Sequence, residues 1–246
     1  MLKVRELTAG YKFPVVRGVS FEVARGEVFA VVGPNASGKS TLLKSIAGLV
    51  RRFSGSVELD GKPLRPEAVA YVPAEERPRV ALSVLEYAAL GRAASRLGWR
   101  AKREDLEAAY GALEALGITH LAERSLAELS TGQRQLAAIA QALAKEPEVL
   151  LLDEPTSALD LKYQIKAMRA VAEYVRRRKA VVVLVHHDLN LASEFSDKMG
   201  LMKNGRLIAL GAPEEVLVRE ALEEAYEVPI EVVEVNGKRK VFPSVP

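Results

Sequence analysis

The sequence contains no cysteine, and this excludes disulfide bonds and thiolate metal sites. It also lacks an apolar run near the roughly 18 residues that a membrane-spanning helix needs, and its first residues do not resemble a signal peptide. The 35 Lys and Arg residues nearly balance the 32 Asp and Glu residues, so net charge gives no reason to expect a nucleic-acid partner. These absences predict a soluble chain that stays inside the cell and binds no nucleic acid.

Charge does gather at one place, the run Arg176–Lys179, where we expect the end of a helix. A solvated helix end that complements the helix dipole is favoured there over a membrane or nucleic-acid contact. With 49% hydrophobic residues, the 246-residue chain can bury a substantial core. We expect one large domain, or a core with an inserted subdomain.

One stretch predicts a phosphate-binding loop. Two glycines with four residues between them are followed by Lys and Ser; the loop residues are Gly33, Pro34, Asn35, Ala36, Ser37, Gly38, Lys39, Ser40 and Thr41. The apolar run 28–32 before the loop predicts a buried strand, and residues 41–46 after it have helical spacing. A chance match in a glycine-rich turn is disfavoured because strand, pattern and helix coincide.

Each position in this loop has a physical role. The glycines allow close backbone approach, Lys39 supplies a charge for the outer phosphates, and Ser40 offers a hydroxyl to Mg²⁺. Thr41 adds a donor for the inner phosphate. Ala36 stands where many such loops have a third glycine, and we expect it to be tolerated only with a negative φ.

Residues 2–32 alternate in polarity and predict short strands that form an antiparallel patch. Tyr11 follows Gly10 on an expected loop within this patch, where an exposed aromatic ring could stack on adenine. The alternative is a tyrosine packed on the sheet edge.

The rest of the chain changes character twice. Residues 83–145 have helical patterns and predict an insert. Strands then return, and the expected elements are strands at 149–152 and 181–185, a helix at 161–178, a hairpin around Asn204–Gly205, a helix near 213–218 and an alternating tail at 230–241.

Asp153 and Glu154 follow the apolar run 149–152, and Pro155 ends the strand. Because ligands bind at the carboxyl ends of parallel strands, we expect both carboxylates to lie beside Lys39. Asp153 can hold Mg²⁺, and Glu154 can polarise a water that attacks the γ-phosphate.

The stretch 129–133, Leu-Ser-Thr-Gly-Gln, resembles the signature of the ATP-binding cassette (ABC) family. The resemblance covers essentially the whole chain, because the phosphate loop, this signature, the two carboxylates, the Ser-Ala-Leu-Asp stretch 157–160 and His187 follow one another in the family's order. It implies an ATPase that uses ATP and Mg²⁺, with the α/β fold of the phosphate-loop NTPases: a mixed, largely parallel sheet, an antiparallel β patch and an inserted helical subdomain.

The resemblance assigns further roles. Ser130, Thr131, Gly132 and Gln133 would cap the γ-phosphate of ATP held by a second copy, and a helix N-terminus there suits an anion. Asp160 would link the two sites, or be an ordinary N-cap for the next helix. His187 would contact the γ-phosphate, whereas His186 points to the other side of the strand.

Two positions depart from the family pattern. Ala74 stands where the family has a glutamine that reaches Mg²⁺ and the attacking water, so either Glu75 substitutes or that ligand is missing. Thr131 replaces the usual glycine of the signature.

Several stretches resemble the ATPase subunits of importers for iron-siderophore, haem or cobalamin, among them 88–92, 187–192, 159–164 and the tail at 232–234 and 241–243. This resemblance implies a homodimer peripheral to the cytoplasmic face of the membrane, bound to permease subunits and served indirectly by an external substrate-binding protein. It also implies one ABC ATPase domain, with a core at 1–77 and 146–221, a helical subdomain at 78–145 and a tail at 222–246. The alternatives are a soluble ABC ATPase outside transport, or a regulatory subunit with impaired hydrolysis.

Overall fold

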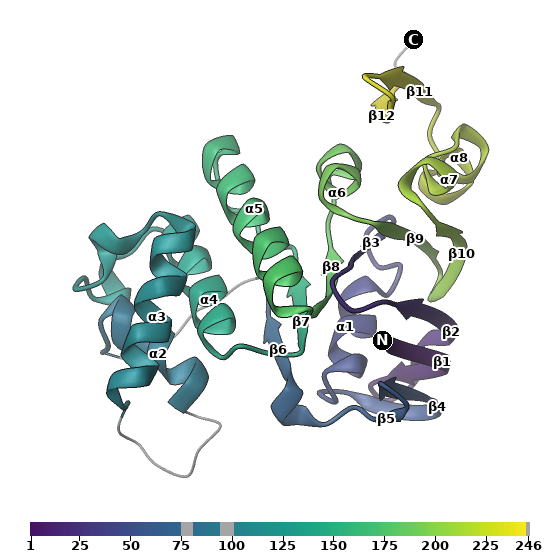
Figure 1. The fold of residues 1–246 in the computed structure, drawn as a ribbon. Coiled ribbons are helices and arrows are strands. Elements are labelled where there is room, and N and C mark those ends of the chain that lie inside the picture. The colour runs from purple at the N-terminus through teal and green to yellow at the C-terminus, as the bar shows by residue number, and fades with distance from the viewer. Residues whose placement is uncertain (75–80, 94–100, 245–246) are drawn as a thin grey trace. The chain divides into compact units, whose positions relative to one another are not determined.

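The computed structural model describes residues 1–74, 81–93 and 101–244, and the chain divides into two compact units. Unit 1 comprises Met1–Pro66 and Val181–Pro246, and unit 2 comprises Glu67–Ala180. Helices and strands of both units are drawn in Figure 1. They form an α/β protein, as the sequence predicts.

Unit 1 contains the predicted antiparallel patch as a four-stranded sheet. Its order is β2-β1-β4-β5, with β1 at Leu2–Gly10, β2 at Pro14–Val23, β4 at Arg51–Leu59 and β5 at Lys62–Pro63. Alternate residues of β1 are buried, which gives this sheet one apolar face. That face meets the next sheet where the rings of Phe21 and Phe29 lie 4.5 Å apart, centroid to centroid.

A second, mixed sheet forms the centre of unit 1. Strand β3 (Val28–Val32) pairs in parallel with β8 (Val181–Val185) and with β9 (Lys198–Lys203). Strand β10 (Arg206–Gly211) returns antiparallel to β9 through the predicted Asn204–Gly205 turn. Every residue of β3 and β8 is buried, as expected for continuous apolar runs in a covered sheet.

The C-terminal part of unit 1 holds more structure than the sequence suggested. Helix α7 (Pro213–Val216) lies near the predicted helix, but α8 (Arg219–Tyr226) was not predicted. The alternating tail is a hairpin of β11 (Ile230–Val235) and β12 (Lys238–Pro243), which we call the C-terminal hairpin. Leu217, Leu222 and Ile230 from this part pack in one buried cluster with Val32 of β3.

Unit 2 combines a parallel strand pair with the helices of the predicted insert and with the helix predicted at 161–178. Strand β6 (Val69–Val72) pairs with β7 (Val149–Asp153). The helices are α2 (Val84–Ala93), α3 (Arg103–Leu116), α4 (Thr131–Ala144) and α5 (Leu161–Arg178). A capping box begins α2, since Ser83 Oγ accepts from Glu86 N–H and Glu86 Oε2 accepts from Ser83 N–H.

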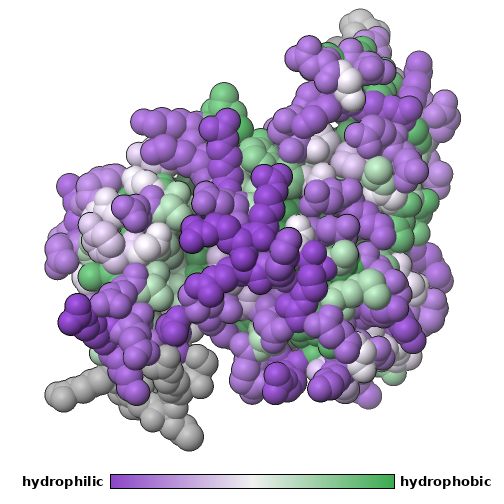
Figure 2. Space-filling model, in the orientation of Figure 1, coloured by the Kyte–Doolittle hydropathy of each residue, from purple (hydrophilic) through white to green (hydrophobic). Residues whose placement is uncertain are grey.

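Helix α5 ends in the predicted basic run. All four residues of Arg176–Lys179 are exposed at the last turn and C-cap of the helix. Hydrophilic side chains make up much of the visible surface around α5 in Figure 2, although Leu161 at its start is also exposed. In the described part of the chain, no helix is both long enough and apolar enough to cross a bilayer.

A buried carboxylate helps to order the helices of unit 2. Asp105 is almost fully buried in the first turn of α3, where its Oδ2 accepts from Lys102 N–H at 2.9 Å and its Oδ1 lies 3.4 Å from Arg92 Nε. Arg92 also binds Glu146 at 2.8 Å, and Glu146 binds Arg178 of α5. This chain of charges therefore connects α2, α3 and α5.

We predict that Asp105→Ala lowers the free energy of unfolding by about 2 kcal/mol, because it removes a buried acceptor from an N–H group and from a guanidinium. Arg103→Ala in the same helical turn is the control. It breaks only the exposed pair with Glu107, which contributes at most about 0.5 kcal/mol. Urea unfolding of both variants measures the difference, and equal losses would contradict the role assigned to Asp105.

Candidate active site

The phosphate loop follows β3 and leads into α1 (Lys39–Ile46), as predicted. Gly33 has φ 143°, and a Cβ there would lie 2.2 Å from the Met202 carbonyl oxygen of β9. Gly38 has φ 103° and forms the N-cap of α1, where no side chain caps the helix. Backbone N–H groups at this helix start are therefore available for an anion.

Two buried side chains inside the loop also fit a phosphate chain. Lys39 is 5% exposed, and its Nζ donates to the carbonyl oxygens of Gly33 and Pro34 at 2.8 Å each. Ser37 is 3% exposed, and its Oγ has no hydrogen-bond partner among the residues that the structure describes. A buried ammonium group and a buried hydroxyl, in a loop with several positive φ values, are suited to bind a polyphosphate.

Ala36 contradicts one expectation, because its φ is +61°. The loop needs a left-handed residue at this position to turn its N–H groups inward, and the surrounding chain imposes that conformation in spite of the methyl group. For an L-residue the left-handed region costs about 1 to 2 kcal/mol. The reasoning that alanine requires a negative φ was wrong.

Tyr226 of α8 packs against the buried cluster that includes Val32, the residue directly before the loop, and the sequence did not indicate this packing. Burial raises the pKa of its hydroxyl to about 12, and the backbone of Gly33 acts in the opposite direction. The phosphate loop is thus supported from β9 and from α8, both within unit 1.

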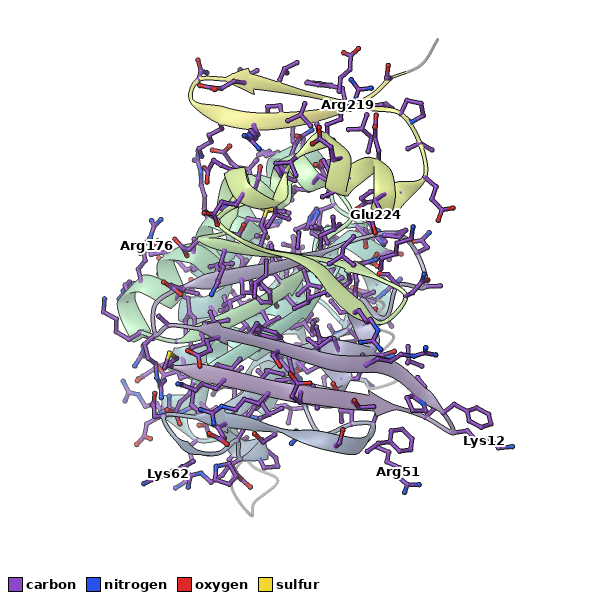
Figure 3. The ribbon with its side chains drawn as sticks, turned by 90° about the vertical axis from the view of Figure 1, so that its right-hand side faces the viewer. Lys12, Arg51, Lys62, Arg176, Arg219 and Glu224 are labelled. Atoms are coloured by element: carbon purple, nitrogen blue, oxygen red, sulfur yellow. The ribbon has the colours of Figure 1, made fainter. Side chains whose placement is uncertain are left out.

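Tyr11 lies on the loop between β1 and β2 and is 57% exposed. Phe13 and Phe53 are also exposed near this end of the sheet, where Lys12 and Arg51 project into solvent (Figure 3). Neither phenylalanine was predicted from the sequence as a site residue. The exposure of Tyr11 disfavours packing on the sheet edge, and its stacking on adenine stays a prediction.

The two histidines that follow β8 differ in exposure, as strand alternation predicts. His186 is 6% exposed, and its Nδ1 accepts from Asp188 N–H at 3.0 Å. His187 is exposed. Asp188 then caps α6 (Leu189–Phe195) by accepting from Leu191 N–H at 2.9 Å.

In unit 2 the two predicted carboxylates stand at the end of β7. Asp153 is 2% exposed and accepts from the Tyr71 hydroxyl at 3.1 Å, a partner that the sequence did not reveal. Glu154 is half-buried, with φ +50°. A non-glycine residue in this conformation carries strain of the kind that clusters at functional sites.

The signature residues begin α4. Ser130 is the N-cap, and its Oγ accepts from Gln133 N–H at 3.2 Å while Gln133 Oε1 accepts from Ser130 N–H at 3.0 Å. Thr131 is exposed and accepts from Arg134 at 3.2 Å. A Cβ at Gly132 would lie 2.7 Å from the Ala158 carbonyl oxygen, so the close packing here requires glycine.

A cavity of about 240 Å³ opens beside this helix start. Ser130, Gly132 and Asp160 line it together with His120 and Tyr163, two residues that the sequence analysis did not single out. Asp160 is also the N-cap of α5, since its Oδ1 accepts from Tyr163 N–H at 3.0 Å. The capping role is therefore present, and the proposed interface role is compatible with it.

The position that departs from the family pattern lies after β6. Ala74 follows Pro73, whose carbonyl accepts from Gln135 Nε2 at 3.2 Å. Glu75, which would replace the missing glutamine, lies outside the described residues. The candidate residues thus form one group in unit 1 and one group in unit 2.

Comparison with known proteins decides the family. The family model described as ABC transporter matches residues 16–157, more than half of the chain. The chain belongs to the ABC transporter family. The expected fold class and ATPase activity are confirmed by this membership.

Relatives and solved structures of ABC proteins match nearly the whole chain. The hemin import ATP-binding protein HmuV of Gloeobacter violaceus is 41% identical over 85% of this chain and 80% of its own. The ferric enterobactin transport ATP-binding protein FepC of Escherichia coli is 37% identical over 92% of this chain and 86% of its own. An inward-facing transporter assigned to the metal-chelate type superimposes with a TM-score of 0.84, at 30% identity over 99% of this chain and 97% of its own.

A dimeric ABC cassette, solved in a post-hydrolysis state with ADP and phosphate, is also similar. It has a TM-score of 0.78 and 28% identity over 87% of this chain and 99% of its own.

We predict that Ala36→Gly raises the free energy of unfolding of this ABC protein by about 0.5 to 1 kcal/mol. Relief of the left-handed strain exceeds the extra backbone entropy of glycine in the unfolded chain. Ala47→Gly, at φ −67°, is the control and should destabilise, since no strain is relieved there. Denaturant unfolding compares the two, and a loss of stability in Ala36→Gly would contradict the account of the loop.

Proposed function

We propose that this chain is the ATP-hydrolysing subunit of an ABC importer that energises uptake of a metal chelate of the iron-siderophore, haem or cobalamin type. The observation that carries the proposal is the buried, left-handed phosphate loop in a chain that matches hemin and ferric enterobactin import proteins along most of its length. The loop supports ATP binding. The relatives support the direction of transport and the class of cargo.

The chain's own residues take the following roles in this proposal. Lys39 and the N–H groups of the loop hold the phosphates, and Tyr11 stacks on the base. Ser40 and Asp153 would hold Mg²⁺, with Glu75 as a further candidate, and the ion supplies charge neutralisation between the phosphates. Glu154 orients and polarises the attacking water.

Hydrolysis is proposed to need two copies of the chain. Ser130, Thr131, Gly132 and Gln133 of one copy cap the γ-phosphate of ATP bound to the other copy, and Asp160 connects the two sites. The open cavity beside α4 and the dimeric state of a similar cassette support this arrangement. His187, exposed at the end of β8, contacts the γ-phosphate.

The proposed homodimer lies at the cytoplasmic face of the membrane, bound to permease subunits, and serves an external binding protein indirectly. Within each chain, residues 1–77 and 146–221 would be the nucleotide-binding core, 78–145 the helical subdomain and 222–246 the tail. ATP binding would favour the closed dimer by a few kcal/mol, which is enough to shift a two-state membrane partner.

We predict that Glu154→Gln lowers the turnover of ATP by at least about 100-fold while ATP binding persists, because the amide keeps the shape of the side chain and loses its basicity. Size-exclusion chromatography with Mg-ATP should show a larger dimer fraction than for the unmodified chain. The control is Glu107→Gln on the exposed side of α3, with unchanged turnover. Undiminished hydrolysis in Glu154→Gln would remove Glu154 from its role.

Ala74 is the observation that favours the second candidate function, a regulatory subunit with impaired hydrolysis. If another group already compensates for the missing glutamine, Ala74→Gln raises turnover by no more than about twofold. Steady-state hydrolysis across a Mg²⁺ titration measures this effect. A chain that binds ATP, shows no turnover even with its membrane partner, and gains turnover on Ala74→Gln would favour the regulatory function.

A further inference from the structure

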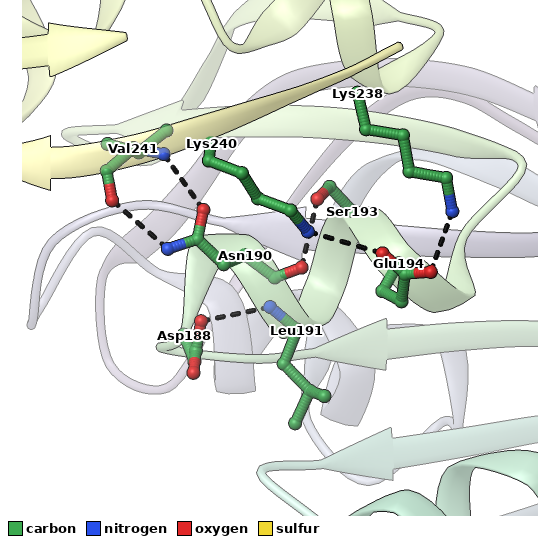
Figure 4. Close-up of polar contacts among 8 residues, drawn as sticks. All are labelled: Asp188, Asn190, Leu191, Ser193, Glu194, Lys238, Lys240 and Val241. Atoms are coloured by element: carbon green, nitrogen blue, oxygen red, sulfur yellow. Dashed lines mark hydrogen bonds and ion pairs between the residues drawn. The ribbon is translucent and has the colours of Figure 1, made fainter. Parts of the chain in front are cut away.

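The C-terminal hairpin is attached to α6 through a paired hydrogen bond. Asn190 Oδ1 accepts from Val241 N–H at 2.8 Å, and Asn190 Nδ2 donates to the Val241 carbonyl oxygen at 3.0 Å (Figure 4). One side-chain amide therefore satisfies both backbone groups of a β12 residue, as a neighbouring strand would do. The pair is part-buried and fixes the position of α6 against β12 in two directions.

Other contacts between α6 and the hairpin are of two kinds. Glu194 binds Lys238 at 2.8 Å and Lys240 at 3.2 Å, and these ion pairs are partly exposed and hence weak. Val241 and Val232 pack against the buried cluster that includes Ala192 of α6. The two Asn190–Val241 hydrogen bonds therefore fix the orientation of α6 against the hairpin, whereas the apolar packing and the partly exposed ion pairs are less directional.

Helix α6 is in turn tied to the histidine segment before it. Asp188 caps α6, and its own N–H donates to His186 Nδ1, while His186 N–H donates to the Val31 carbonyl oxygen of β3 at 3.3 Å. His187 lies between these two fixed residues. A rotation or shift of α6 therefore displaces the backbone that carries His187.

We propose that Asn190 is a positioning residue for His187, and that the C-terminal hairpin acts through it to hold α6 in place. The inference rests on the proposed role of His187 at the γ-phosphate. Neither Asn190 nor Val241 needs to touch ATP for this effect. The tail of the chain would then contribute to hydrolysis and not only to stability.

The expected effect is on turnover more than on substrate affinity. A misplacement of about 1 Å at a reacting group can cost up to about 100-fold in rate, whereas the phosphate loop that binds ATP has contacts of its own with β9, where Gly33 lies against the Met202 carbonyl. Asn190→Ala should therefore lower kcat of the full chain by roughly tenfold or more and leave KM for Mg-ATP within about twofold.

The test is a double-mutant cycle between Asn190→Ala and His187→Ala, measured as steady-state ATP turnover of the full chain. If Asn190 acts through His187, Asn190→Ala lowers kcat by less than about twofold in the His187→Ala background. The matched control is Glu194→Gln, which weakens only the exposed ion pairs between the same two elements. Its kcat should stay within about twofold of the unmodified chain.

The outcomes separate this inference from the proposed function. Unchanged turnover in His187→Ala would overturn the proposed role of that histidine. A clear loss in His187→Ala, together with either no loss or a fully additive loss from Asn190→Ala, would overturn the positioning role alone. An equal loss of kcat in Glu194→Gln would also overturn the assignment to the Asn190–Val241 pair.

A milder variant covers the case in which Asn190→Ala does not fold. Asn190→Gln keeps both the acceptor for Val241 N–H and the donor to its carbonyl, on a side chain that is longer by one methylene group. It should give a smaller loss of kcat with the same non-additivity toward His187→Ala, and additivity there would contradict the proposal.

Discussion

The site in this protein depends on one backbone constraint: the loop after β3 must turn its N–H groups toward a single point. Gly33, Ala36 and Gly38 all have positive φ, and the Met202 carbonyl leaves no room for a Cβ at Gly33. The strand before the loop is completely buried, so the loop cannot relax by shifting its base. Alanine at one of the three positions shows that the packing around the loop outweighs the local preference of the chain.

Unit 2 provides the second surface of the proposed ATP site, the N-terminus of α4, and its first turn is already ordered. The reciprocal Ser130–Gln133 bonds fix the first turn of α4, and the contact of Gly132 with the Ala158 carbonyl fixes the next loop against it. Few degrees of freedom remain to be lost when an anion binds there. An ATP phosphate chain between two such preorganised surfaces would stabilise a closed dimer more than an open one, and this difference is what a transporter can use.

Elements with strong local signals could be predicted from the sequence. The helix Leu161–Arg178 agrees residue for residue, because Asp160 caps its start and a basic run marks its end. Strands β3 and β8 were evident from continuous apolar runs. Asp153, Glu154 and the signature residues could be named because their motif fixes their order along the chain.

Features that depend on tertiary packing could not be predicted. The positive φ of Ala36 has no local signal in the sequence, helix α8 is short and lacks a capping side chain, and the packing of Tyr226 in one cluster with Val32 joins distant residues. The Asn190–Val241 pair likewise needs the hairpin folded back on α6. Sequence periodicity contains no information on such contacts.

In the proposed function, ATP is held between the phosphate loop of one copy and the signature of another. Because the chain has no cysteine, Asn35→Cys can be placed in one preparation and Thr131→Cys in a second, both at exposed positions. After mixing, a short bifunctional maleimide should join the two chains into a heterodimer when Mg-ATP is present and not in its absence. Equal cross-linking with and without nucleotide, or none in either case, would contradict the account.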